Sequence, residues 1–290
     1  MTTFLKLAAR GKTAWWRYLL TIVLAAVAWV VAIVAGFVVL ILARLNPTRL
    51  AQDLTRPTDI AVFFGGTAVL FGLLLVAFAL AIRVVHGKRF GDITGQWDWR
   101  LTLRGAAIWL VVCVVAGLAD YLIEPNGFSY TARAATLTLT LWAAPSLILQ
   151  TFTEEFIFRG YITQGLFLAT RRPLVTAIVS GLLFAALHIP NGWPQAANAA
   201  AFGAVTALIA VRTGSIAFTF GLHVVNNLFG ALILVSANDV FRGSPALFTQ
   251  ATPNLMWLDA AVPFVALIAA LWFAGVRPPW ASREVSPRPS

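Results

Sequence analysis

The sequence predicts an all-α polytopic membrane protein with about eight transmembrane helices, and three observations support that class. Of its 290 residues, 60% are hydrophobic and only 11% are charged, whereas roughly a quarter of the residues in a water-soluble domain are charged. The mean hydropathy is +0.83. Apolar runs of about 20 residues, the length that crosses a bilayer core, recur along the chain. These observations exclude an ordinary water-soluble domain.

The apolar runs predict the helices in order. They cover residues 17–42, 60–84, 101–123, 134–169, 173–189, 194–211, 215–235 and 255–276. The first is too long for a cleavable signal peptide and is expected to remain as a helix. The fourth is too long for one plain span, so its second part, 160–172, is expected to leave the bilayer or to lie along the interface.

The chain divides into four parts by composition. Residues 1–133 are predicted to form an N-terminal membrane scaffold of three helices, and 134–236 a catalytic helical core. Residues 237–276 then hold the last loop and helix. The tail 277–290 is rich in Pro, Ser and Arg without periodicity, so we expect it to be disordered and cytoplasmic.

The positive charge indicates topology. The formal charge is +10, but the basic residues are scattered between apolar runs and do not form the patch that nucleic acid requires. Most of them fall on the side of the membrane that holds the N-terminus. The positive-inside rule therefore places both termini in the cytoplasm. We expect an integral protein of a bacterial plasma membrane, in contact with lipid and with no nucleic-acid partner.

Polar residues inside the spans are informative because a charge at the centre of a bilayer costs at least about 2.5 to 3.5 kcal/mol. Almost all of them lie in the fourth to seventh segments. The set is Gln150, Glu154, Glu155, Arg159, His188, Asn198, His223, Asn226 and Asn227. Asn198 is expected to make a contact between helices. His86, outside this set in a basic loop, is expected to be solvated.

Helical spacing sorts this polar set into pairs. Glu155 and Arg159 are four residues apart, in the order that favours an ion pair along one helix. Glu154 is rotated by about 100° from Glu155 and faces another partner.

The same four-residue spacing recurs twice. His223 and Asn227 share a face of the seventh segment, from which Asn226 is expected to point away, and Phe184 and His188 repeat the spacing on the fifth. The site is predicted to lie below the cytoplasmic surface.

Two kinds of chemistry suit these residues. A carboxylate beside a histidine can take a proton from water and return it to a leaving amine, while a second histidine and an amide donate hydrogen bonds to the oxyanion. Alternatively, two histidines and one glutamate complete the three-ligand set of a catalytic zinc site. No HExxH motif is present.

Three motifs occur in order within the fourth to seventh segments. "EEFIFR" fits EExxxR, "FAALH" fits FxxxH and "HVVNN" fits HxxxN. With this order the chain resembles the CPBP family, the CAAX-protease and bacteriocin-processing membrane endopeptidases, also called the Abi or type II CAAX prenyl endopeptidase family. The resemblance covers about residues 136–234.

The resemblance implies a role for each matching residue. Glu154 and His188 would activate water, His223 and Asn227 would hold the oxyanion, and Glu155, Arg159 and Phe184 would support them. Members of this family are often labelled metalloproteases. We prefer a mechanism that requires no metal, because Asn227 is a poor zinc ligand and a good oxyanion donor. Zinc on His188, His223 and Glu154 is the alternative.

Three functions remain open from the sequence. The first is an intramembrane endopeptidase acting on a membrane-anchored protein or peptide, lipidated or not, in CAAX-type maturation or in bacteriocin processing or immunity. The second is a proton-coupled transporter that uses the same glutamates and histidines. The third is a non-catalytic membrane scaffold or immunity protein. The sequence does not indicate the cleavage sequence or the oligomeric state.

Overall fold

All the long elements of the described residues are helices. The computed structural model describes residues 3–44, 54, 56–237 and 239–251. Its long helices are α2 (Trp15–Leu42), α4 (Pro57–His86), α6 (Trp99–Ile123), α7 (Ala134–Glu155) and α10 (Trp193–Thr213). The shorter ones are α1 (Thr3–Ala8), α5 (Phe90–Thr94), α8 (Thr163–Thr170), α9 (Pro173–Ala186) and α11 (Ala217–Leu228). The predicted all-α class is confirmed.

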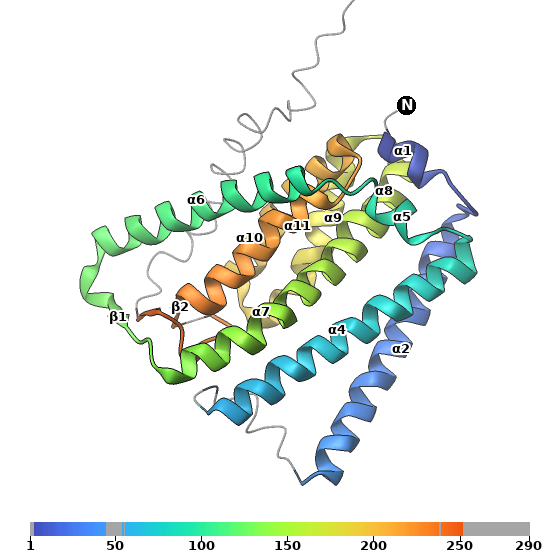
Figure 1. Ribbon diagram of the computed structural model, residues 1–290. Helices are drawn as coiled ribbons and strands as arrows, with labels where there is room; N and C mark the ends of the chain where they lie inside the picture. Colours follow the sequence, from blue (N-terminus) through green and yellow to red (C-terminus); the bar gives the residue numbers. More distant parts are fainter. Residues whose placement is uncertain (1–2, 45–53, 55, 238, 252–290) are drawn as a thin grey trace, which may run out of the picture.

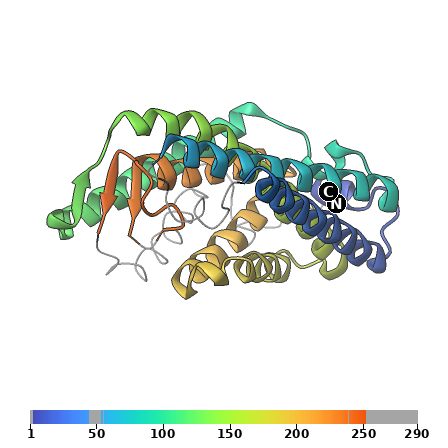
Figure 2. The same ribbon diagram turned by 90° about the horizontal axis from the view of Figure 1, so that it is seen from below.

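The helices form two layers. Helices α2, α4, α7, α11 and α6 lie side by side in that order, each in contact with the next (Figure 1). Helices α9 and α10 pack closely against each other, and Figure 2 shows them together on one side of the first layer. The space between the two layers holds the polar residues that the sequence analysis selected.

The fourth predicted segment is one continuous helical stretch with an irregular middle. Between α7 and α8, residues Phe156–Ile162 form the π-helix η2. The hydroxyl of Thr163 donates 2.7 Å to the carbonyl of Phe158, which also accepts the backbone N–H of Thr163. Because π-turns are rare and concentrate at functional sites, this irregularity directly after Glu154 and Glu155 marks the region.

Close packing of α6 against α11 depends on two glycines. A Cβ added at Gly221 would overlap the backbone carbonyl of Thr102, and one added at Gly105 would overlap the carbonyl of Phe218. Small residues let helix backbones approach closely in membranes. The crossing brings Trp109, one turn after Gly105, against the polar face of α11.

A small sheet closes one end of the bundle. Strands β1 (Phe128–Tyr130), β2 (Leu234–Ser236) and β3 (Phe248–Gln250) form it in the order β1-β3-β2. β3 pairs antiparallel with β1 and parallel with β2. A second π-helix, η4 (Phe229–Ile233), leads from α11 into β2. The sequence did not predict these three-residue strands.

The outer surface is apolar over the long helices. Five helical stretches of the described chain are long and apolar enough to span a membrane: α2, α4, α6, the stretch from α7 to α8, and α10. The chain is an integral membrane protein. α9 and α11 are shorter than a plain span, so the count of eight is not confirmed. The eighth predicted segment, 255–276, and the tail, 277–290, lie outside the described residues.

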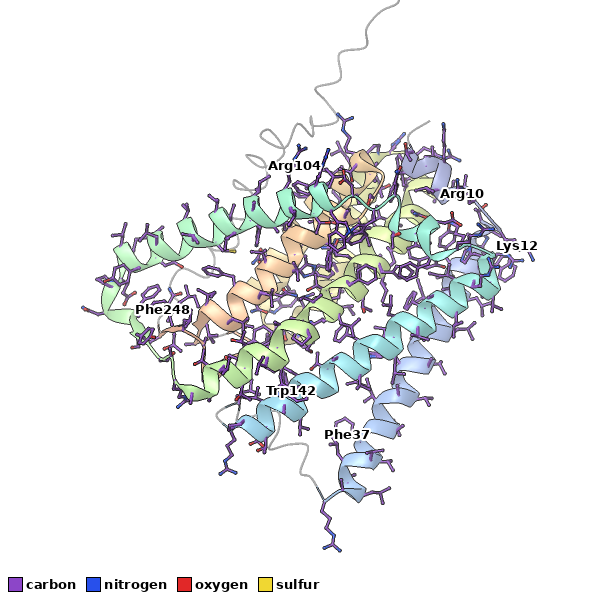
Figure 3. All side chains as sticks on the ribbon, viewed as in Figure 1. Arg10, Lys12, Phe37, Arg104, Trp142 and Phe248 are labelled. Carbon is purple, nitrogen blue, oxygen red and sulfur yellow. The ribbon has the colours of Figure 1, made fainter. Side chains whose placement is uncertain are left out.

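Basic side chains occur at both ends of the bundle. In Figure 3, Arg10 and Lys12 lie close to each other at one end. The cytoplasmic position of the termini stays a prediction.

The N-terminal end contains a buried polar cluster, formed by His86, Lys88, Asp92, Tyr161 and Gln164. His86 bonds the carbonyl of Lys12 through Nδ1 at 2.6 Å and the hydroxyl of Tyr161 through Nε2 at 2.8 Å. It is fully buried. The expectation that His86 is solvated is therefore wrong, because the N-terminal segment folds over it.

Candidate active site

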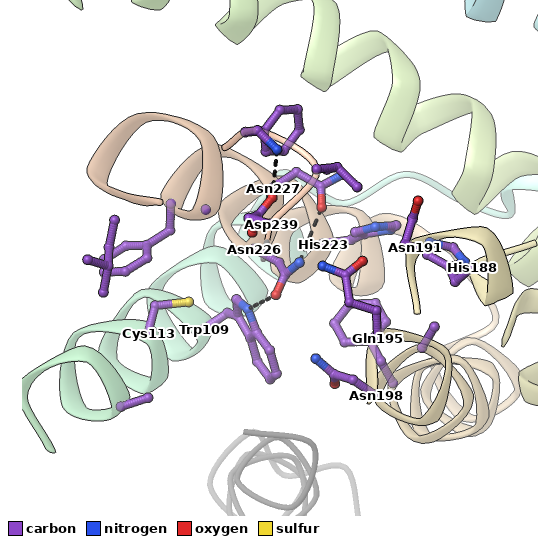
Figure 4. A pocket seen from close by; sticks show the side chains of 18 of the residues that line it. Trp109, Cys113, His188, Asn191, Gln195, Asn198, His223, Asn226, Asn227 and Asp239 are labelled. Carbon is purple, nitrogen blue, oxygen red and sulfur yellow. Dashed lines mark hydrogen bonds between the residues drawn. The ribbon is translucent and has the colours of Figure 1, made fainter. Parts of the chain in front are cut away.

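A cavity of about 370 Å³ lies between the two helical layers. Its size falls in the range of small-molecule and peptide sites, roughly 300 to 1,000 Å³. Helices α6, α7 and α11 line it from one layer, and the end of α9 and the start of α10 from the other (Figure 4). Its polar lining residues are Asp120, Gln150, Glu154, His188, Asn191, Gln195, Asn198, His223, Asn226, Asn227, Asp239 and Gln250.

His223 lies between the two adjacent glutamates of α7. Its Nδ1 donates to Glu155 Oε1 at 2.8 Å, and its Nε2 lies 3.5 Å from Glu154 Oε2. A carboxylate on one ring nitrogen fixes the ring orientation and leaves the other nitrogen for chemistry. The side chain of His223 is 5% exposed and that of Glu154 is 15% exposed, so the reactive nitrogen faces the edge of the cavity.

The predicted pair of Glu155 and Arg159 is confirmed, and it is part of a larger arrangement. Arg159 Nε lies 3.4 Å from Glu155 Oε1, and both side chains are fully buried. Arg159 Nε also donates to Thr206 Oγ1 at 2.8 Å, and its guanidinium lies 4.1 Å from the ring of Phe184. Arg159 therefore neutralises the carboxylate that orients His223.

Glu154 faces the cavity, separate from the Arg159 pair. Its Oε1 accepts a hydrogen bond of 3.1 Å from Gln150 Nε2, while its Oε2 points toward His223. Since Nδ1 of His223 carries a proton, a neutral ring would present a lone pair at Nε2 to an ionised Glu154. Two acceptors facing each other repel, so the pair holds either a shared proton or a bridging water.

His188 approaches the cavity from the other layer. Helix α9 ends at Ala186, so His188 lies in the turn that follows and not within a helix that continues to 189, as predicted. Its Nδ1 donates to the carbonyl of Phe184 at 2.8 Å, which leaves Nε2 as the acceptor of the neutral ring. Among the ion pairs of the described residues, none joins His188 to Glu154; the cavity lies between them.

Phe184 joins the parts of the site. Its ring centroid lies 4.5 Å from that of His188 and 5.9 Å from that of His223, at angles of 48° and 86°. The same ring packs on the guanidinium of Arg159. Phe184 thus spaces the two imidazoles and covers the buried ion pair, as a supporting residue would.

The amide of Asn227 belongs to a chain of hydrogen bonds. Trp109 Nε1 donates to Asn226 Oδ1 at 3.1 Å, and Asn226 Nδ2 donates to Asn227 Oδ1 at 3.2 Å (Figure 4). Asn227 Nδ2 then donates to Thr151 Oγ1 at 3.0 Å. The expectation that Asn226 points away from the site is wrong, because the residue three positions after His223 also lies on its helix face.

Some lining residues were missed by sequence reasoning. Trp109 lies in the middle of α6, away from the ends where interfacial tryptophans gather, and a buried indole N–H needs a partner. Those two facts could have identified it. Asn198, expected to join helices, lines the cavity, and so does Gln195. Gln195 follows Pro194 at the start of a helix and carried no signal of its own.

The donor atoms do not fit a metal centre as they stand. Among the described residues, no group of three His, Cys, Asp or Glu side chains is arranged to hold an ion. Of the zinc alternative's three ligands, Glu154 and His223 are close and His188 is separate. Both histidines use Nδ1 in a hydrogen bond and keep Nε2 available, while Asn227 bonds amide and hydroxyl groups.

An apolar groove adjoins the polar cavity. It has a volume of about 500 Å³ and shares Gly117, Phe229 and Leu234 with the cavity wall. Its other walls are residues of α6, β1, η4 and β3, all of them apolar or aromatic except one serine. They are Val114, Leu118, Tyr121, Phe128, Ser129, Tyr130, Ile233 and Phe248.

The helices that carry the site match a known family. Residues 136–229 match the model of the type II CAAX prenyl endopeptidase Rce1-like family. This part of the chain is similar to the Rce1-like family. The match confirms the resemblance drawn from the three motifs, and all three lie inside the matched residues.

A relative of nearly equal length also matches. The chain is 28% identical over 292 residues to the uncharacterized protein YyaK of Bacillus subtilis (strain 168), an alignment that covers 94% of this chain and 96% of YyaK. The name of YyaK states no activity. No solved structure matches the chain significantly.

Proposed function

We propose that the chain is a membrane-embedded endopeptidase that hydrolyses a peptide bond with a water activated by glutamate and histidine. The observation that carries the proposal is His223 between two carboxylates at the edge of a polar cavity, with Glu155 on Nδ1 and Glu154 toward Nε2. The Rce1-like match supports the same class of reaction.

The proposed reaction uses each residue once. Glu154 takes a proton from a water oriented with the help of His188 Nε2, and the water oxygen bonds to the peptide carbonyl carbon. His223, held by Glu155 and protonated on both ring nitrogens, donates a hydrogen bond through Nε2 to the oxyanion that forms, and the amide of Asn227 donates another. The carbon–nitrogen bond then breaks, and Glu154 gives its proton to the leaving amine. No metal takes part in any step.

The substrate in this proposal is a membrane-anchored protein or peptide. The apolar groove beside the cavity supports it, because its apolar and aromatic walls can pack against a hydrophobic side chain or a lipid group next to the scissile bond. Whether that group is lipid or peptide decides between CAAX-type maturation and the processing of an unmodified membrane peptide.

The other two functions make different predictions. A transporter would move protons or cations across vesicles without releasing a peptide fragment. A scaffold would do neither. The polar cavity and the oriented imidazole favour catalysis, since a scaffold gains nothing from desolvating Glu154 and His223 together.

The test is cleavage by the purified protein in vesicles. We expect membrane-tethered peptides to be cut at one bond, and two peptides with and without a lipid group, incubated separately, to show which the groove prefers. Absence of any fragment from a broad set of tethered peptides, with proton flux present, would favour the transporter. Full activity after chelation, with no stoichiometric zinc by metal analysis, agrees with the proposed mechanism; loss on chelation and return with zinc contradicts it.

Cys113 provides an independent check on the location. It is the single cysteine of the chain and lines the cavity. A small thiol-reactive alkylating reagent should slow cleavage by the wild-type protein. The Cys113→Ala variant, treated in the same way, should keep its activity.

A further inference from the structure

The hydrogen-bond chain from Trp109 to Thr151 has a direction. An indole N–H only donates, so it accepts no hydrogen bond from a partner. At 3.1 Å from Asn226 it must meet the amide oxygen and not the amide nitrogen. Trp109 is 2% exposed, so water does not replace Asn226 as the partner of its indole N–H.

The orientation of Asn226 determines that of Asn227. With Oδ1 toward Trp109, Asn226 turns its Nδ2 to the neighbouring side chain, and only the oxygen of Asn227 can accept that bond. The NH₂ group of Asn227 is then on the side of Thr151. A hydroxyl both donates and accepts, so Thr151 would accept either orientation of the Asn227 amide. Trp109 is the member of the chain that selects one.

The orientation matters for charge. One N–H of Asn227 bonds Thr151 Oγ1, and the second is free for an oxyanion. A reversed amide would present its carbonyl oxygen, a partial negative charge, to the oxyanion and would raise the barrier instead of lowering it.

We infer that Trp109 and Asn226 are positioning residues that fix the amide orientation of Asn227, so that the N–H not bonded to Thr151 faces the reacting carbonyl oxygen. The inference rests on the oxyanion role proposed above for Asn227. It brings α6, which lies outside the matched residues 136–229, into the reaction.

The test removes or reverses one member at a time. Trp109→Phe keeps an aromatic ring and loses the donor, and kcat should fall several-fold with KM unchanged. Asn226→Asp can accept from Trp109 but cannot donate when ionised, so Asn227 must reverse to donate to it, and kcat should fall about 10- to 100-fold, the usual effect of losing an orienting partner. Because the introduced carboxyl donates again when protonated, part of the loss should return as the pH falls.

Matched controls separate orientation from packing and charge. Trp29, on α2, also has a buried indole N–H but no hydrogen-bond partner among the described residues, so Trp29→Phe should leave kcat unchanged. Asn198→Asp adds a charge to the same cavity but lies outside the hydrogen-bond chain. It should lower kcat less than Asn226→Asp does, and kcat should not recover at low pH.

The decisive comparison is made in two backgrounds. In Asn227→Ala protein, which has no amide to orient, Trp109→Phe and Asn226→Asp should cause no further loss. Equal losses in the two backgrounds, or unchanged kcat for Asn226→Asp in the wild-type background, would overturn the inference while wild-type cleavage keeps the proposed function. If the wild type cleaves nothing, the proposed function fails, and melting temperatures then test the hydrogen-bond chain. Trp109→Phe should lower the melting temperature of the wild type by more than that of Asn226→Leu, because both lose the packing of the indole and only the wild type also loses the hydrogen bond. Equal lowering contradicts the chain.

Discussion

The N-terminal polar cluster and the polar cavity place similar residues in opposite situations. In the cluster, the side chains bond mostly backbone carbonyls. Lys88 Nζ donates to the carbonyl of Ala8 at 2.9 Å, and Gln164 Nε2 donates to the carbonyl of Asp92 at 2.7 Å. In the cavity, Glu154 and His223 face each other at 3.5 Å beside open volume. Buried polar groups that are satisfied hold a fold together, whereas groups with capacity left over can act on a substrate.

One helical stretch joins the two regions. Residues 150–164 run from Gln150 in the cavity, through η2, to Gln164 in the cluster. Replacing a residue at one end should therefore change chemistry and at the other end stability. Four predictions test that separation.

The largest effect is expected from Glu154→Gln. The amide keeps the shape of the side chain but takes no proton from water, so the cleavage rate should fall about 10²- to 10⁴-fold. The melting temperature in detergent should not fall. As a control, Gln164→Leu breaks bonds in the cluster and should lower the melting temperature while the rate per folded molecule stays the same. A Glu154→Gln protein that cuts at the wild-type rate would remove the assignment of the base.

Arg159→Met should mainly affect stability. It leaves Glu155 as a buried charge beside His223, and breaking such a pair costs about 3 to 5 kcal/mol. Denaturant unfolding in mixed micelles measures the loss. Arg171, an exposed cation just after α8, gives the control: Arg171→Met should change the free energy of unfolding little. Equal small losses for both variants would mean that the buried pair contributes nothing.

Glu155→Gln should affect the rate without changing substrate binding. It keeps an oxygen for His223 Nδ1 but removes the charge that stabilises the imidazolium when the oxyanion forms. We expect kcat to fall about 10- to 100-fold and KM to stay within a few-fold. Steady-state kinetics on a tethered peptide separate the two. A raised KM with unchanged kcat would place Glu155 in substrate binding instead.

The smallest effect is expected at Lys88. Burial lowers the pKa of its amine to about 8, so folding opposes its charged form. The folded protein carries this penalty below about pH 8 and loses it as the pH rises from there toward the ordinary value of a lysine. The melting temperature of the wild type should therefore rise between pH 7 and pH 9.5 relative to that of Lys88→Met. A constant difference between the two proteins would contradict the assignment.

Much of the fold could be predicted because the membrane restricts it. Apolar length alone places α2, α4, α6 and α10 within a few residues. What it misses are departures from plain spans: the π-helix after Glu155, the early end of α9, and the three-residue strands. These depend on contacts between different segments, such as that of Thr163 with Ser180 of α9, which periodicity does not show.

The site residues could be selected from the sequence, but their pairing could not. Spacing along one helix correctly joins Glu155 to Arg159. It does not show that His223, 68 positions later, takes the same carboxylate, because that contact depends on how α11 packs against α7. Likewise, helical spacing alone placed Asn226 away from the site, because it does not show the hydrogen bond that Trp109 of α6 donates to Asn226.

The most direct measurement follows the water oxygen. Wild-type protein and Glu154→Gln are incubated with a tethered peptide in water enriched in oxygen-18, and the new carboxyl terminus is weighed by mass spectrometry over a single turnover. The account predicts one heavy oxygen in the wild-type product, incorporated at the rate of cleavage, and almost none on the same time scale with Glu154→Gln. Equal incorporation by the two proteins would contradict it.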